Sequence, residues 1–204
     1  MDLFVLAADK NVEYAIKGGL TRHQALGTRH FTFDTKVHVG RDGGARSSGV
    51  DMLALEQDKY YATVLIFDFE GCGTDKNSAL ELEMELDQSL LAKVGPRSKA
   101  IVINPEADIW MWGGDNVLAE VLRWRGPGGI REWLGQRGFA FDDNGKPVRP
   151  KEAMDKVAAE CRTPRSSALY QRIATRLSLQ NCIDPAFIRL RDKLVQWFPI
   201  DIDE

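Results

Sequence analysis

The chain has 204 residues, of which 44% are hydrophobic and 28% are charged, and its formal net charge is −3. This length is enough for one domain with a buried core. The sequence contains no run of about 18 apolar residues and no basic segment at its start, so it predicts neither a membrane span nor a secretory signal. Its three widely spaced cysteines argue against a disulfide framework and favour a cytoplasmic location.

The first half of the chain alternates predicted strands with predicted helices. Runs of apolar, β-branched or aromatic residues indicate the strands, and apolar residues at helical spacing indicate the helices between them. We expect strands at residues 3–8, 31–39, 60–67 and 100–104, and helices at residues 12–20, 50–59 and 77–94. Residues 40–49 are rich in glycine and are expected to form a surface loop. The candidate helix N-caps are Asp9 or Asn11 and Asn77 or Ser78.

After Pro105 the pattern changes, and helices are predicted for the rest of the chain. They are expected at residues 117–124, 129–137, 151–162, 166–179 and 185–198. Strands that alternate with helices favour parallel pairing through right-handed crossovers. The sequence therefore predicts an α/β fold with a mainly parallel sheet of about four strands flanked by helices, followed by a helical C-terminal half. We expect residues 1–112 to form the core and residues 113–204 to pack on it as a helical extension.

Acidic residues follow three of the predicted strands. Asp9 follows the first strand, Asp68 and Glu70 follow the third, and Glu106 and Asp108 follow the fourth. Because ligands of parallel sheets bind beyond the carboxyl ends of the strands, these side chains are expected to meet there. Carboxylate oxygens suit Mg²⁺, which activates water and neutralises phosphate charge. The alternative is that one carboxylate caps a helix and the other is solvated.

This arrangement resembles the Toprim fold of topoisomerases, primases and overcoming-lysogenization-type nucleases, in which a Glu follows the first strand and DxD or DxE follows a later one. Residues 5–13 (VLAADKNVE) look like the strand that runs into VEGxTE in a Toprim-like family of bacterial proteins. Residues 108–110 (DIW) look like its EaW motif, residues 184–187 (DPAF) look like its PSF helix, and residues 146–152 also fit. Members of this family occur in phage-defence islands, and the chain looks most like a small component of the methylation-associated defence system.

The resemblance implies a Mg²⁺ site at the acidic strand ends. The catalytic carboxylates that it implies are Asp68, Glu70, Asp9 and Glu13, and the metal ligands are Asp68, Glu70 and Asp108. The sequence departs from the family at the end of the first strand, where Ala8 stands in place of the Glu and Asp9 follows one position later. Asp9 is one candidate substitute for that Glu, and Glu13, from the first helical turn, is the other.

Charge is segregated along the chain. Residues 1–120 carry a net charge of −7 and residues 121–198 a net charge of +7. This pattern suggests a carboxylate-lined site beside a surface that meets a polyanion. The candidate phosphate- or partner-binding residues are Arg41, Arg46, Arg165, Arg172 and Arg176.

Two functions stay open from the sequence. One is a subunit of an anti-phage defence complex that contacts nucleic acid or partner proteins. The other is a Mg²⁺-dependent nuclease that cleaves phosphodiester bonds. The expected partners are other defence proteins, DNA or RNA, and further copies of the chain.

Overall fold

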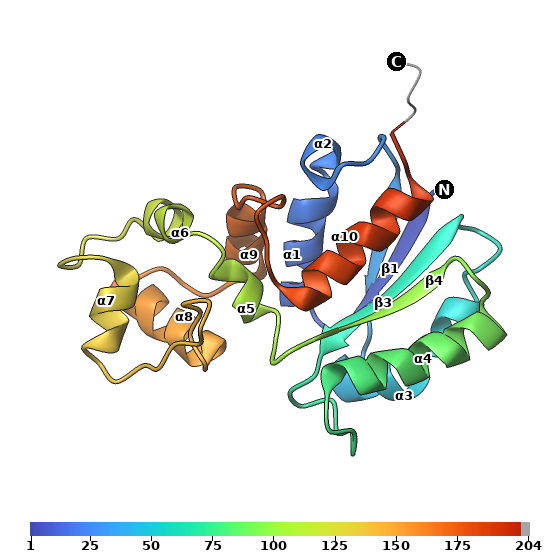
Figure 1. Ribbon diagram of the computed structural model, residues 1–204, viewed down its shortest axis with the longest axis horizontal. Helices are drawn as coiled ribbons and strands as arrows, with labels where there is room; N and C mark the ends of the chain where they lie inside the picture. Colours follow the sequence, from blue (N-terminus) through green and yellow to red (C-terminus); the bar gives the residue numbers. More distant parts are fainter. Residues whose placement is uncertain (201–204) are drawn as a thin grey trace.

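The computed structural model describes residues 1–200 and shows a four-stranded sheet with helices on both faces (Figure 1). The strands are β1 (Leu3–Ala7), β2 (Phe33–Val37), β3 (Ala62–Asp68) and β4 (Ser98–Ile103). All neighbouring pairs are parallel, and the strand order is β2-β1-β3-β4. The predicted α/β fold with a parallel sheet is therefore confirmed.

Both faces of the central strands are buried, because helices cover both sides of the sheet. Successive side chains of a strand point to opposite sides and therefore enter two different cores. The flanking helices are α1 (Lys10–Leu20), α3 (Arg41–Ala54), α4 (Ala79–Lys93) and α10 (Pro185–Trp197). Val5 and Val64 pack on one side in a core shared with α1 and α10. Leu6 and Leu65 pack on the other side with α3 and α4. Burial on both faces explains why these strands are continuous apolar runs.

Two of the predicted N-caps are present. The side chains of Asp9 and Ser78 each accept a hydrogen bond from the backbone N–H three residues later, at 2.9 Å and 3.2 Å, at the starts of α1 and α4. Asp184 caps α10 in the same manner and also accepts the indole N–H of Trp110 at 2.9 Å. This last bond ties the start of α10 to the segment that follows β4.

A buried ion cluster fastens α4 and α10 to β4. Glu83 of α4 is fully buried and accepts bonds from the Nζ of Lys99 at 2.7 Å and from two nitrogens of Arg189 at 2.7 and 2.9 Å. It also accepts the backbone N–H of Val102 at 3.0 Å. Both carboxylate oxygens are therefore used, and loss of the cluster would leave unpaired charge in the core.

Helix α1 crosses α9 (Ser167–Ala174) closely at a glycine. A Cβ atom on Gly18 would lie 2.8 Å from the Cβ of Ala174 and 2.9 Å from the carbonyl oxygen of Gln171. The next residue, Gly19, has no such neighbour within 4 Å. The crossing therefore requires a glycine at position 18 but not at position 19.

The prediction of a surface loop at residues 40–49 is wrong, because this segment forms the start of α3. The helix runs from Arg41 to Ala54, so it also replaces the separate helix predicted at residues 50–59. A Cβ atom on Gly49 would lie 2.6 Å from the side chain of Leu65, and Gly44 packs against the ring of His38. The glycines thus allow close helix–sheet packing, which outweighs their low helix propensity.

The second half of the described chain is helical, as predicted. Besides α9 and α10, its helices are α5 (Asp108–Met111), α6 (Asp115–Leu122), α7 (Ile130–Gly135) and α8 (Pro150–Glu160). In the first half, the short helix α2 (His23–Leu26) is not among the predicted helices. Helices α6, α7 and α8 lie beyond α5 and α9, away from the sheet (Figure 1). Four tryptophans are buried and help to fill the interior, namely Trp110, Trp112, Trp133 and Trp197.

Candidate functional site

An acidic cleft of about 930 Å³ lies at the carboxyl ends of the strands. It forms there because β1, β3 and β4 are neighbouring parallel strands, so the segments that follow them leave the sheet at the same edge. Its acidic lining residues are Asp9, Asp42, Asp68, Glu70, Glu106, Asp108 and Asp155, and its Lys and Arg residues are Lys10, Arg41, Lys151 and Arg165. Carboxylates therefore outnumber Lys and Arg side chains along its walls.

Asp68 is the last residue of β3 and lines the cleft. Its Oδ1 accepts the backbone N–H of Ala107 at 2.8 Å, and its own backbone N–H donates to Oδ1 of Asp42 at 2.9 Å. Burial, followed by the charges of Asp42, Asp9 and Glu106, raises the pKa of Asp68 well above its usual range. Within residues 1–200 its carboxylate has no ion-pair partner, so its ionised form is unfavourable here unless a cation joins it.

Asp9 and Asp42 stand at the starts of two helices. One oxygen of Asp9 is used in capping α1, and Asp42 lies in the first turn of α3. Burial, aided by the charge of Asp9, raises the pKa of Asp42, although the hydrogen bond from Asp68 opposes this shift. Asp42 is not among the predicted site residues, because its glycine-rich segment predicts a loop. A helix assignment would have placed this acid in a first turn, where carboxylates are favoured.

Glu106 and Asp108 follow β4 but have different partners. Asp108 is buried and accepts hydrogen bonds from the hydroxyl of Tyr170 and from Arg165, the latter at 3.2 Å. Both of its oxygens are therefore engaged within the protein, although the sequence suggested a metal ligand. Glu106 lies 3.6 Å from the Nζ of Lys151, and burial, together with the charge of Asp108, raises the pKa of Glu106 to about 7.

The cleft brings together only some of the predicted site residues. Asp9, Asp68, Glu70 and Asp108 line it, but Glu13 does not. Glu13 instead forms an ion pair with Lys17 at 2.8 Å and accepts the hydroxyl of Thr35 on β2. The structure therefore separates Glu13 from the other acids.

The predicted basic residues are also divided. Arg41 and Arg165 line the acidic cleft. Arg46 donates to the carbonyl of Cys72 at 2.8 Å and orders the loop after β3. Arg172 donates to a carbonyl at the end of α6, and Arg176 pairs with an exposed glutamate of the same helix. Packing between helices thus distributes residues that are close in sequence over separate surfaces.

The chemistry of the cleft fits a hydrated divalent cation. Among residues 1–200, no three His, Cys, Asp or Glu side chains are arranged to hold a metal by themselves. Mg²⁺ does not need such a set, because it keeps several waters and binds through one or two carboxylates together with phosphate oxygens. Asp68, with Asp9 or Asp42 beside it, supplies the carboxylates and the excess negative charge for this mode of binding.

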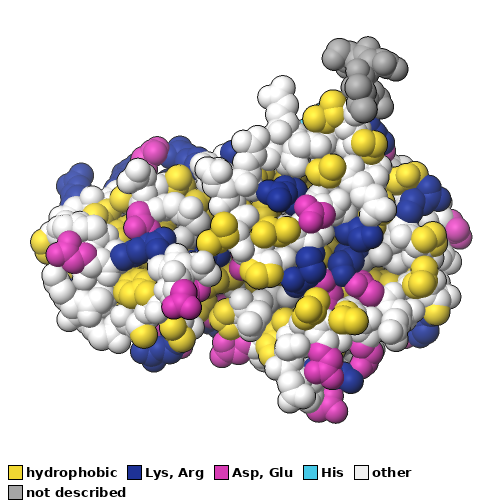
Figure 2. All heavy atoms as spheres, in the orientation of Figure 1, with side chains coloured by type: hydrophobic (Ala, Val, Ile, Leu, Met, Phe, Trp, Pro, Cys, Tyr) yellow, Lys and Arg dark blue, Asp and Glu magenta, His cyan; other side chains and the backbone are white. Residues whose placement is uncertain are grey.

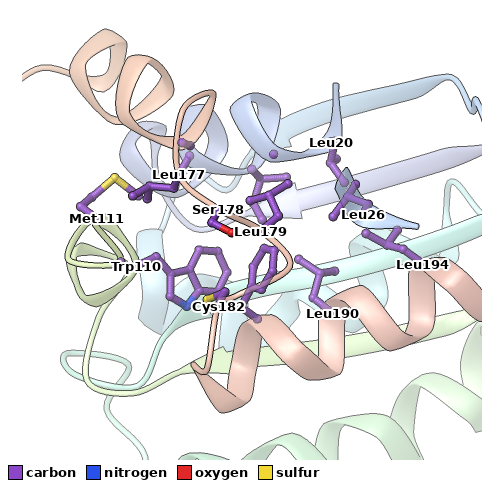
Figure 3. A pocket seen from close by; sticks show the side chains of 16 residues that line it. Leu20, Leu26, Trp110, Met111, Leu177, Ser178, Leu179, Cys182, Leu190 and Leu194 are labelled. Atoms are coloured by element: carbon purple, nitrogen blue, oxygen red, sulfur yellow. The ribbon is translucent and has the colours of Figure 1, made fainter. Parts of the chain in front are cut away.

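A second hollow lies between α1, α5 and α10 and has a different character (Figure 3). Its volume is about 40 Å³, and its walls are almost entirely apolar, with Leu20, Trp110, Leu177 and Leu190 among them. A space of this size holds only a few atoms, and an apolar cavity of this kind stays dry. It is a packing defect of the core rather than a site for polar chemistry.

The fold and the cleft define an α/β protein with a parallel four-stranded sheet and a carboxylate-rich site at its carboxyl edge. No protein-family model matches this chain, and neither a curated protein nor a solved structure matches it. None of the helices within residues 1–200 is both long enough and apolar enough to span a membrane.

Proposed function

We propose that this chain is a Toprim-like subunit of a cytoplasmic bacterial anti-phage defence complex, and that its acidic cleft contacts the phosphate backbone of DNA or RNA through Mg²⁺. The observation that carries this proposal is Asp68, a carboxylate at a strand end, surrounded by Asp9, Asp42 and Glu106 and without a cationic partner in the described chain. A partly buried cluster of like charges is costly unless a cation joins it. The cleft is therefore suited to take up a cation together with an anionic ligand.

Each residue has a role in this proposal. Asp68 and Asp9 would hold the metal, which when bound neutralises phosphate charge and lowers the pKa of a coordinated water. Arg41, Lys151 and Arg165 lie along the same cleft and would bind phosphate oxygens directly. The ion pair of Arg165 with Asp108 holds its guanidinium at the cleft wall.

Cleavage of phosphodiester bonds is the second candidate function. Glu106 favours it, because a carboxylate in the cleft with a pKa near neutrality is suited to general acid–base catalysis. Ala8 at the place of the family's first-strand Glu favours a contact role without cleavage. We therefore place the contact role first.

Thermal unfolding in the presence and absence of Mg²⁺ tests the cleft. A ligand present at about 100 times its Kd stabilises a folded protein by about 2.7 kcal/mol, which is a rise in Tm of about 5 to 10 °C for a chain of this size. We expect this rise in the unmodified chain and its loss in Asp68→Asn, which keeps the side-chain shape and an oxygen for the N–H of Ala107. Asp51→Asn, at an exposed ion pair with Lys93, is the matched control.

Phage challenge of cells carrying the complete defence system tests the function. Asp68→Asn is expected to abolish protection and Asp51→Asn to preserve it. Incubation of the purified complex with labelled DNA and RNA then separates the two candidates, since only a nuclease yields Mg²⁺-dependent fragments. An unchanged Tm response together with full protection by Asp68→Asn would contradict the proposal.

A further inference from the structure

A basic pocket of about 490 Å³ lies between the C-terminal ends of α6 and α8, apart from the acidic cleft. We define the basic pocket by its lining, residues 123–127 and 160–162. Arg123, Arg125 and Arg162 are its cationic residues, and Glu160 is its one acidic residue. All three arginines are exposed, and within residues 1–200 none of their guanidinium groups forms a hydrogen bond or an ion pair. Figure 2 shows basic side chains along the edge of the molecule over α6.

Two of these arginines adopt a backbone conformation that disfavours them. Arg123 has a φ of 55° and Arg162 a φ of 50°, both in the left-handed region. Arg123 directly follows the last residue of α6, and Arg162 lies two residues beyond the last residue of α8. After each of them, the next backbone N–H reaches back to the carbonyl five residues earlier, at 2.8 Å for α6 and 2.9 Å for α8. This is the Schellman arrangement, whose left-handed position favours glycine because a Cβ atom is strained there.

The same chain uses glycine at two other helix ends of this type. Gly27 follows α2 with a φ of 80°, and Gly138 follows α7 with a φ of 81°. In both, the next N–H again bonds to the carbonyl five residues earlier, at 3.0 Å and 3.2 Å. Neither glycine lines the basic pocket. Arginine therefore replaces the favoured residue at the two helix ends that face this pocket.

Attraction to the helix C-terminus does not explain this placement. A basic side chain anywhere in the last turn interacts favourably with the negative end of the helix, without a strained backbone. The left-handed backbone conformation instead sets the direction in which the arginine side chain leaves the helix end. Strain held at two positions around one pocket points to a ligand.

We propose that the basic pocket binds phosphate groups of a nucleotide or of a single nucleic-acid strand. Guanidinium groups bind phosphate oxygens through paired, charge-assisted hydrogen bonds, and three arginines line this pocket. The volume lies in the range of small-ligand sites. Binding here needs no divalent cation, so the proposal stands independently of the acidic cleft.

Fluorescence anisotropy with a short labelled single strand, as DNA and as RNA, tests the proposal in the presence of EDTA. The double variant Arg123→Gly/Arg162→Gly is expected to bind about tenfold more weakly or worse, with a salt dependence smaller by about 1.4 in the log–log slope, since each lost phosphate contact removes about 0.7. Its Tm is expected to rise by about 2 °C, because glycine suits both positions. A higher Tm together with weaker binding of the labelled strand would not result from general disruption of the fold.

Two further variants complete the test. Arg125→Gln removes the third guanidinium without touching either helix end, so it tests binding even where the glycine variant fails to fold. Lys93→Gln/Arg97→Gln removes two positive charges from the end of α4 and its connection to β4, outside the basic pocket. This variant is expected to bind as the unmodified chain does. Competition by inorganic phosphate or a mononucleotide identifies a single phosphate site, and competition by oligonucleotide alone identifies a strand-binding site. Unchanged binding by the glycine and Arg125→Gln variants, or an equal loss in the charge control, would overturn the proposal.

Discussion

Replacing Glu106 with glutamine removes one charge from the acidic cleft while keeping the shape of the side chain. The pKa of Glu106 is about 7 in the folded protein, against 4.5 for an ordinary glutamate, because burial and the charge of Asp108 disfavour the ionised form. The folded state therefore binds this proton more tightly than the unfolded state. The resulting stability is fully present below pH 4.5 and is lost as the pH rises through 7.

The magnitude follows from the two pKa values. Their difference corresponds to about 3 kcal/mol over the whole titration, and about 2.5 kcal/mol of this falls between pH 5 and pH 8. Glu106→Gln resembles the protonated form at every pH. The variant is therefore expected to be about 1 kcal/mol more stable than the unmodified chain at pH 5 and about 3 kcal/mol more stable at pH 8, where its Tm is higher by about 6 to 12 °C.

Thermal unfolding followed by circular dichroism, at several pH values and without divalent cations, measures this difference. Glu120→Gln, which changes an exposed glutamate of α6 paired with Arg176, is the matched control for the removal of one carboxylate outside the cleft. A difference between Glu106→Gln and the unmodified chain that stays constant from pH 5 to pH 8 would refute the assignment of a raised pKa. A variant that is less stable at pH 8 would refute the repulsion in the cleft.

Three further predictions concern the scaffold and are checked by chemical denaturation. Gly18→Ala is expected to destabilise the chain by about 1 to 3 kcal/mol, because its Cβ atom meets α9. Gly19→Ala is expected to stabilise it by up to about 1 kcal/mol. Equal effects of the two substitutions would contradict the described crossing of α1 and α9. Glu83→Ala is expected to cost about 3 kcal/mol, because Arg189 and the backbone N–H of Val102 lose their carboxylate and Lys99 keeps only Asp87, and a cost near zero would show that the cluster does not hold α4 to β4. Ser78→Ala is expected to cost about 1 kcal/mol through loss of the α4 cap, and Ser78→Gly should cost less.

Much of the fold follows from local patterns in the sequence. The apolar runs at residues 3–8, 60–67 and 100–104 identify strands buried on both faces, and their alternation with helices requires parallel pairing. The exception is residues 40–49. Glycine-rich composition predicts a loop, but the space needed beside Leu65 and His38 makes these glycines part of a helix. Composition does not reveal whether a glycine serves a turn or a close contact.

The sequence by itself determined that Asp9, Asp68 and Glu70 line one cleft, because parallel strands end at one edge and the residues that follow them share it. Only the tertiary structure decided which carboxylates are left without a partner. Asp108 is engaged by Tyr170 and Arg165 from the helical half, and Glu13 is engaged by groups on α1 and β2. Charge pairing and burial depend on which elements pack together over long sequence distances. Hydrophobic periodicity predicts single helices and strands and does not predict those contacts.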